Sequence, residues 1–195
     1  MSIPGLRQRA EDFELVTNYD LIAAANALMG NIDLDPASSK FANDYVQAEH
    51  YYTPSDDGLN QQQWFGNVYV FPPNGAYFWD APLSRWKITR SSAKTLSSSH
   101  AVWFRRLYRE WVGGQIKQGL YFTNCPDMIR YEQKIFDFPI CILKTKPVLV
   151  KRTSTEVSKH VTATSMVIYL PPVDSSGEAV ENFVDIYSPK GRVLC

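Results

Sequence analysis

The sequence predicts an α/β domain with a mostly parallel sheet and an antiparallel end. Short apolar strands alternate with helical segments in the first part of the chain, whereas strands follow one another over short connections in the last part. A chain of 195 residues can bury one sizeable hydrophobic core, so we expect residues 1–195 to form a single domain.

The composition indicates a folded cytoplasmic protein. Hydrophobic residues make up 45% of the chain and aromatic residues 13%, which is typical of a globular rather than a disordered protein. No apolar run approaches the roughly 18 residues of a membrane span, and the first residues lack the apolar stretch of a signal peptide. Cys125, Cys141 and Cys195 are odd in number and scattered, which favours reduced thiols. We therefore expect no membrane partner.

The first predicted elements are a helix, a strand and a second helix. Residues 19–29 have one apolar face, with Asn18 as the expected N-cap and Gly30 as the end. Residues 31–36 form a short strand that stops at a proline, and residues 37–48 repeat apolar side chains at helical spacing.

Two further strands precede a long polar segment. Residues 50–53 are followed by the turn-rich segment 54–58, and the apolar residues 67–71 run into two prolines, which cannot continue a sheet ladder. Residues 85–99 are basic and serine-rich, and they are interpreted as a mobile surface loop.

The remaining elements are one strong helix and several strands. Residues 99–112 carry Trp103, Leu107 and Trp111 on one stripe, and two glycines follow. The later expected elements are a helix from 126 to about 135 and strands at 120–123, 140–143, 148–150, 166–170 and 183–187.

Three loops leave the carboxyl ends of the early strands, where open α/β sheets bind their ligands. These loops are Asp35-Pro36-Ala37-Ser38, Asp56-Asp57-Gly58 and Phe71-Pro72-Pro73-Asn74. Carboxylates suit sugar hydroxyls or an amine, and a helix starting at Ala37 would offer free N–H groups. Taken singly, Asp-Pro and Asp-Asp-Gly are also ordinary turn sequences.

The order and spacing of these loops and of their neighbours carry a family resemblance. The other matching segments are Thr17-Asn18, Ile32-Asp33-Leu34, Ala42-Asn43, Ala48, Tyr51-Tyr52-Thr53, Leu59, Trp64 and Gly66-Asn67-Val68-Tyr69-Val70. Together they resemble the phage-type DNA N6-adenine methyltransferases, the Dam-like family of prophages, over residues 14–80 and more faintly to residue 143.

The resemblance implies a Rossmann-like class I methyltransferase domain that binds S-adenosylmethionine and DNA and needs no metal. The loop 35–38 would lie near the methionine part of the cofactor, and the two aspartates of the second loop near its ribose or adenine. The cofactor-binding residues implied are Thr17, Asp33, Asp35, Pro36, Ala37, Ser38, Asp56 and Asp57. The loop Phe71-Pro72-Pro73-Asn74 would hold an adenine flipped out of the duplex.

That third loop departs from the family pattern Asn-Pro-Pro-Tyr. There the Asn oxygen and a Pro carbonyl accept the two N–H bonds of the adenine amine, and the aromatic ring stacks on the base. Here Phe71 stands in the place of the acceptor and Asn74 in the place of the aromatic residue, while the Pro72 carbonyl remains. Loss of one such acceptor costs about 10²–10³ in rate.

The sequence leaves several outcomes open at this loop. Asn74 could act as the acceptor, with a nearby aromatic residue as the stack; Asp80 is another acceptor; or the loop is inactive. The candidate stacking residues are Phe71, Tyr77, Phe78 and Trp79. Thr17-Asn18, where the family has Thr-Pro, and residues 124–127 also depart from the pattern, as expected of a pseudoenzyme or a repurposed relative.

A charge asymmetry points to DNA as a partner. Residues 1–80 hold three basic and eleven acidic side chains, whereas residues 81–195 hold seventeen basic and nine acidic ones. A basic run without acidic residues could hold a polyanion, although a solvated basic face has the same composition. The run consists of Arg85, Lys87, Arg90, Lys94, Arg105, Arg106 and Arg109, of which we expect the first six to contact DNA.

The tryptophans and histidines suggest different roles. Helical spacing favours core packing for Trp103 and Trp111, whereas for Trp79 and Trp86, beside the third loop, the sequence leaves both base stacking and core packing open. The three histidines lack companions at ligand spacing, so neither a metal site nor a catalytic triad is expected. Two hypotheses remain: a DNA adenine methyltransferase, or a non-catalytic DNA- or protein-binding module on the same fold.

Overall fold

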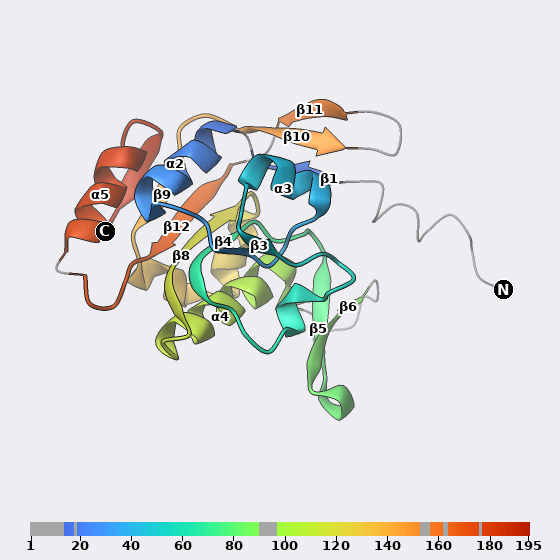
Figure 1. Ribbon diagram of the computed structural model, residues 1–195. Coiled ribbons are helices and arrows are strands. Elements are labelled where there is room, and N and C mark those ends of the chain that lie inside the picture. Colours follow the sequence, from blue (N-terminus) through green and yellow to red (C-terminus); the bar gives the residue numbers. More distant parts are fainter. Residues whose placement is uncertain (1–13, 18, 90–96, 153–156, 162–163, 176) are drawn as a thin grey trace.

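A seven-stranded sheet forms the centre of the protein in a computed structural model that describes residues 14–17, 19–89, 97–152, 157–161, 164–175 and 177–195 (Figure 1). Its strand order is β13-β9-β12-β8-β4-β2-β3. The strands are β2 Leu34–Asp35, β3 His50–Tyr51, β4 Gly66–Val70, β8 Ile116–Thr123, β9 Ile140–Leu143, β12 Met166–Leu170 and β13 Gly191–Leu194.

The direction of the strands confirms the expected α/β fold. β3, β2, β4 and β8 pair parallel to one another, and β12, β9 and β13 complete the sheet through antiparallel pairs. The sheet is therefore mostly parallel with an antiparallel end.

Helices cover both faces of the sheet. The helices α2 (Tyr19–Met29) and α5 (Glu178–Tyr187) lie on one face, and α4 (Ser99–Val112) lies on the other (Figure 1). Alternate residues of β4 divide between the two cores, since Val68 and Val70 pack with α4 whereas Tyr69 packs with α2 and α5. None of the helices in the described ranges has the length and apolar character to cross a membrane.

The helix after β2 is shorter than the sequence predicted. Helix α3 spans Lys40–Val46, and the Ser39 hydroxyl caps it by accepting from the Ala42 N–H at 3.0 Å. The backbone N–H of Ser38 donates instead to the Tyr52 carbonyl at 2.9 Å, so residues 36–39, a turn followed by two irregular residues, precede the helix. The expected helix start at Ala37, with its free N–H groups, is therefore wrong.

Two small antiparallel sheets flank the central one. One has the order β1-β10-β11 and the other the order β6-β5-β7. Their strands are β1 Glu14–Val16, β10 Val148–Arg152, β11 Val157–Val161, β5 Ala76–Asp80, β6 Arg85–Thr89 and β7 Ser97–Ser98. The expected loop 85–99 is wrong at both ends, which are strands, and its middle, residues 90–96, lies outside the described part.

Two further elements differ from the sequence prediction. The strand expected at 183–187 is the end of helix α5, because Phe183 and Tyr187 meet the core on one helical stripe. The helix expected from residue 126 is two 3₁₀ helices, η3 (Pro126–Arg130) and η4 (Gln133–Asp137). The other 3₁₀ helices are η1 Gly58–Asn60 and η2 Ala81–Leu83, and the expected N-cap Asn18 lies outside the described residues.

A buried hydrogen-bond network fixes the amino ends of the central strands. The Asp33 carboxylate accepts from the Asn67 N–H at 2.7 Å, and the Asn67 side chain accepts from Gln118 at 2.9 Å. Gln118 in turn accepts from the Tyr169 hydroxyl at 2.6 Å. Because three strands share these bonds, the network holds their register.

Replacing Gly66 with alanine should destabilise the fold through this network. Gly66 has φ of +65°, and an added Cβ would overlap the Asp33 carboxylate. Gly114→Ala is a matched control, since Gly114 has φ of +66° but open space around it. We expect Gly66→Ala to lower the free energy of unfolding by about 2 kcal/mol more than the control, as measured by urea denaturation. Equal losses in both variants would contradict this account.

Candidate functional site

Three loops lie together at the carboxyl ends of β3, β2 and β4. From β2 the chain proceeds outward to β3, whereas from β4 it proceeds in the other direction to β8, so the strand order reverses between β2 and β4. Ligands of open α/β sheets bind in the crevice at such a topological switch point. The first and third loops leave the two strands that flank this point.

The first loop is a closed turn beside a buried hydroxyl pair. Asp35 is only 3% exposed, and its carboxylate accepts from the Ala37 N–H at 3.1 Å across Pro36. The hydroxyls of Thr17 and Tyr69 form a hydrogen bond at the strand end next to it. Burial raises the pKa of Tyr69, and the neighbouring Asp35 carboxylate raises it further. Tyr69 therefore stays protonated and can serve the site only as a neutral hydrogen-bonding group.

The second loop touches the first. An added Cβ on Gly58 would overlap the Pro36 carbonyl, so these two backbones are in direct contact. Asp56 accepts from the N–H and hydroxyl of Thr53 at 2.8 and 2.6 Å, which lowers the pKa of its carboxyl group. Asp57 has φ of 54°, and both of its oxygens lie 3.0 Å from the Asn60 amide nitrogen. Both carboxylates are exposed at the loop surface.

The third loop points its two unusual residues in different directions. The Phe71 ring packs edge-on against Phe122, with ring centroids 4.7 Å apart, on the α2 and α5 side of the sheet. Pro72 is buried, and the Pro73 carbonyl accepts from the Ser99 hydroxyl at the start of α4. Asn74 is exposed, and its side-chain oxygen lies 3.1 Å from Nε2 of His100.

His100 connects this loop to the end of β8. Its Nδ1 lies 2.8 Å from the Thr123 hydroxyl, which itself accepts from the Cys125 N–H at 3.1 Å. The Thr123 hydroxyl can therefore donate to Nδ1, which leaves the ring proton on Nε2 to donate to Asn74. The His100 carbonyl accepts from the Tyr121 hydroxyl at 2.5 Å. Burial lowers the pKa of His100 to about 4, so the ring is neutral near pH 7.

Asp33 does not join the other expected cofactor residues. Its carboxylate is held by Asn67 at the amino ends of the strands, on the opposite edge of the sheet from the three loops. Thr17, Asp35, Pro36, Ala37 and Ser38 lie at or beside the carboxyl end of β2, and Asp56 and Asp57 lie in the adjoining loop.

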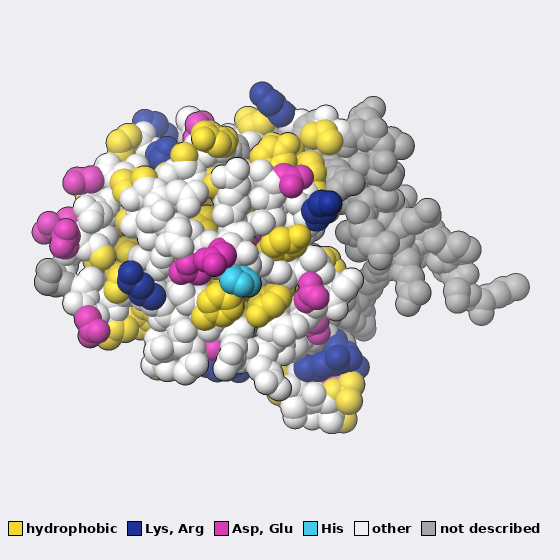
Figure 2. Space-filling model, in the orientation of Figure 1, with side chains coloured by type: hydrophobic (Ala, Val, Ile, Leu, Met, Phe, Trp, Pro, Cys, Tyr) yellow, Lys and Arg dark blue, Asp and Glu magenta, His cyan; other side chains and the backbone are white. Residues whose placement is uncertain are grey.

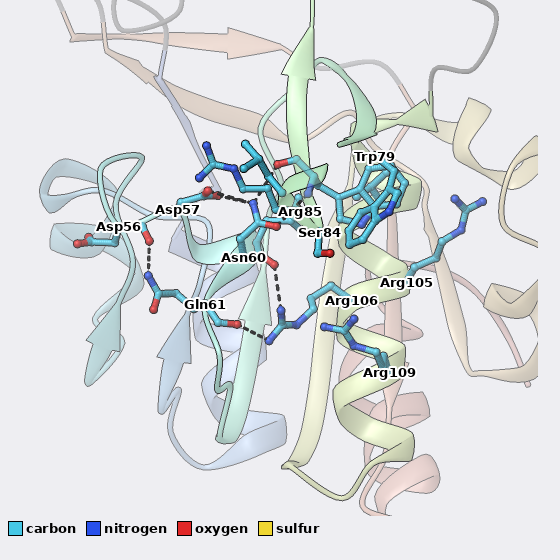
Figure 3. A pocket seen from close by; sticks show the side chains of 14 residues that line it. Asp56, Asp57, Asn60, Gln61, Trp79, Ser84, Arg85, Arg105, Arg106 and Arg109 are labelled. Atoms are coloured by element: carbon cyan, nitrogen blue, oxygen red, sulfur yellow. Dashed lines mark hydrogen bonds between the residues drawn. The ribbon is translucent and has the colours of Figure 1, made fainter. Parts of the chain in front are cut away.

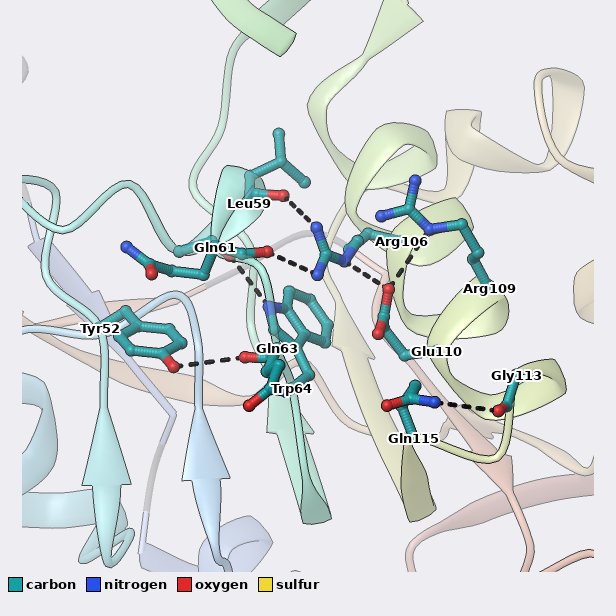
Figure 4. A network of polar contacts seen from close by, with 11 residues as sticks. Tyr52, Leu59, Gln61, Gln63, Trp64, Arg106, Arg109, Glu110, Gly113 and Gln115 are labelled. Atoms are coloured by element: carbon teal, nitrogen blue, oxygen red, sulfur yellow. Dashed lines mark hydrogen bonds and ion pairs between the residues drawn. The ribbon is translucent and has the colours of Figure 1, made fainter. Parts of the chain in front are cut away.

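The residues expected to contact DNA differ in their exposure and in their partners within the fold. Arg106 is buried and holds α4 to η1 and the residue that follows it, donating to the carbonyls of Leu59 and Gln61 at 3.0 and 2.7 Å (Figure 4). It also pairs with Glu110 at 2.9 Å, so its guanidinium serves the fold. Arg105 pairs with Glu132 at 2.8 Å and is partly exposed.

Two other basic residues of that set, Arg85 and Lys87, lie on the hairpin of β5 and β6. Arg85 is exposed near its tip, and Lys87 pairs with Asp80 at 2.5 Å. Figure 2 shows basic side chains beside apolar ones on this projecting hairpin. Arg90 and Lys94 lie outside the described residues, so their expected contacts stay predictions.

A cavity of about 560 Å³ lies between this hairpin, η1 and α4 (Figure 3). Asp56 and Asp57 line one side, and Arg105, Arg106 and Arg109 line the side formed by α4. The sequence did not predict this cavity, because its lining residues come from separate elements and form no motif. It did not predict the role of His100 either, because the contacts of that side chain are with residues distant in the sequence. The aromatic residues Trp79 and Trp86, candidates for base stacking, belong to the wall of the cavity, whereas Trp103 and Trp111 pack into the core as predicted.

Comparisons with protein-family models, curated proteins and solved structures found no match to this chain. In the described ranges, no three His, Cys, Asp or Glu side chains gather closely enough to hold a metal ion.

The buried His100 should make the stability of the protein depend on pH. Its folded pKa of about 4 lies below the ordinary value of 6.5, so the unfolded chain takes up a proton first as the pH falls. We expect this group alone to remove on the order of 3 kcal/mol of stability between pH 6.5 and pH 4. Denaturation curves should show the loss in the wild type, and a smaller loss in His100→Asn, which cannot take up this proton. Parallel pH profiles for the two proteins would rule it out.

Proposed function

We propose that this chain is a Rossmann-like, S-adenosylmethionine-dependent DNA adenine-N6 methyltransferase in which Asn74 supplies the side-chain acceptor. The observation that carries the proposal is the His100–Asn74 contact at the loop after β4. It supports an amide oxygen held on the exposed side of the loop in which the resemblance in sequence requires an acceptor for the adenine amine, although not at the family's own position for that acceptor. The switch point between β2 and β4 and the adjoining loops agree with the fold that the resemblance implies.

The chemistry requires two acceptors for the amine. The lone pair of an exocyclic adenine amine is delocalised into the ring, and hydrogen bonds from its two N–H groups favour a more nucleophilic nitrogen. An amide oxygen has two lone pairs, so Asn74 can accept from the adenine while it accepts from His100. The Pro72 carbonyl is the second acceptor in this scheme. Trp79, half exposed on β5, is one aromatic residue that could stack on the base.

The first two loops carry polar side chains of the type that can hydrogen-bond to the cofactor. S-adenosylmethionine, when bound, supplies the methyl group. Both Thr53 contacts to Asp56 go to a single carboxylate oxygen, and Asp57 is exposed, so both side chains retain lone pairs for ribose hydroxyls. The Asp35 turn and the Thr17–Tyr69 pair form a polar floor beside them.

Methyl transfer to DNA tests the proposal directly. We expect the purified protein to transfer labelled methyl groups to adenine-containing duplex DNA, and Asn74→Ala to lower kcat by about 10²–10³ because it removes an acceptor used in the transition state. Asn182→Ala, an exposed substitution on α5, is the matched control and should leave kcat unchanged. Absence of transfer to DNA of mixed sequence, or full activity of Asn74→Ala, would refute this role of Asn74.

A second candidate function is a non-catalytic DNA-binding protein on the same fold. The observation that favours it is the Phe71 ring, which fills the acceptor position and packs against Phe122 instead of facing a ligand. The double variant Phe71→Asn with Asn74→Tyr separates the two candidates, since it restores the family pattern. Gain of methyl transfer only in this variant would favour an inactive natural protein on a competent scaffold.

Cofactor binding can be measured without catalysis. S-adenosylhomocysteine at about a hundred times its Kd should raise the stability of the folded protein by about 2.7 kcal/mol, which corresponds to roughly 5–10 °C in Tm for a chain of this size. Asp57→Asn should reduce this shift, whereas Asp174→Asn, an exposed acidic residue outside the three loops, should not. A protein with no thermal shift at any attainable concentration does not bind the cofactor, and the second candidate would then stand.

A further inference from the structure

We infer that the cavity between the β5–β6 hairpin and α4 binds one unstacked nucleotide, with the base against the tryptophan wall and the phosphate towards Arg109. This inference goes beyond the proposed methyl transfer, and its binding tests do not depend on it, because Asn74 does not line the cavity; the cavity shares Trp79 and Asp57 with the residues proposed above. Its volume of about 560 Å³ lies within the usual range for a small-molecule site.

The wall formed by the hairpin is aromatic and fixed in place. Trp79 and Trp86 pair across the two strands, with ring centroids 5.5 Å apart and an interplanar angle of 67°. The Asn60 side chain donates to the Trp86 carbonyl and accepts from the Trp86 N–H, both at 3.0 Å, which joins the hairpin to η1. Trp79 is 49% exposed, so its ring keeps apolar surface on which a base can stack.

The wall formed by α4 carries an arginine whose guanidinium is only partly engaged by neighbouring residues. Arg106 is occupied by two carbonyls and Glu110, but Arg109 contacts Glu110 only through Nε, at 3.3 Å. The Arg109 side chain is 68% exposed, so its terminal amino groups can take a phosphate. Arg85 adds a second exposed guanidinium from the hairpin, and in the described part of the chain it makes no ion pair.

The charges of the cavity are divided between its two sides. Asp57 lies across from Arg109, as Figure 3 shows. A nucleotide has the same polarity, since an exocyclic amine on the base can donate to a carboxylate while the phosphate is drawn to arginine and repelled by the aspartate. This arrangement favours adenine, cytosine or guanine over thymine, which has no exocyclic amine.

Binding of short single-stranded DNA tests the inference. One probe carries a single adenine among abasic positions, and the other is abasic throughout, so the two have the same phosphates. We expect the natural protein to bind the adenine probe about tenfold more tightly, since stacking on an aromatic side chain contributes that much per base. Trp79→Ala should abolish this preference, and Trp79→Phe, which keeps an aromatic ring, should retain most of it.

Arginine variants separate the phosphate contact from general attraction. Arg109→Ala should weaken the binding of both probes by the same factor and reduce the slope of log K against log salt by about one. Arg192→Ala, an exposed arginine on β13, is the matched control and should change neither. Equal losses in the two variants would indicate nonspecific charge attraction and overturn the inference.

Two competitors identify the source of the ligand. Deoxyadenosine monophosphate should displace the adenine probe, because it carries the same base and phosphate. If the monophosphate binds as tightly as the probe or more tightly, the ligand of the cavity is a free nucleotide. Displacement of the probe by S-adenosylhomocysteine at its own Kd would mean that the cavity is the cofactor site and would overturn the inference. Failure of methyl transfer leaves these outcomes unaffected, so the two proposals fail separately.

Discussion

His100 joins the first turn of α4 to the carboxyl ends of β4 and β8, and the positions of the third loop and of the cavity wall on α4 depend on this junction. The imidazole contacts Asn74 on one side and Thr123 on the other, and the backbone of the same residue accepts from Tyr121. Because α4 carries Arg106 and Arg109 further along its length, the orientation of that helix sets both the third loop and the wall of the cavity. Protonation of His100 would add an N–H at Nδ1, so the Thr123 hydroxyl would have to accept from the ring instead of donating to it, while the bond from Nε2 to Asn74 would stay.

The two edges of the central sheet serve different purposes. At the amino edge, hydrogen bonds link four polar side chains to one another or to the neighbouring backbone and so hold the register of the strands: Asp33, Asn67, Gln118 and Tyr169. At the carboxyl edge, Asp56, Asp57 and Asn74 are exposed and satisfied only in part by neighbours in the fold. Asp33 and Asp35 illustrate the difference: they lie two positions apart, but Asp33 bonds to Asn67 at the amino edge and Asp35 bonds to the Ala37 N–H at the carboxyl edge.

Sequence patterns predicted the elements whose signals are local. Helix α4 has an apolar stripe ended by two glycines, and it was predicted to the residue, as were β9 and β12. Helix α5 was mistaken for a strand because its β-branched and aromatic residues favour strands, and tertiary packing overrides that preference. The β5–β6 hairpin was missed because its turn lacks the glycine that marks tight hairpins. The His100 contacts span 26 and 23 residues, and a single histidine gives no indication of such partners.

The Asn60 side chain also affects how the protein meets other copies of itself. Strand β6 is the outer strand of its small sheet, and the Trp86 N–H and carbonyl point away from β5, where an incoming strand could bind them. Asn60 occupies both groups and so stands in for a neighbouring strand at that position. At Trp86 the open edge of the hairpin is therefore closed to an incoming strand, while apolar side chains such as Leu83 stay exposed to solvent.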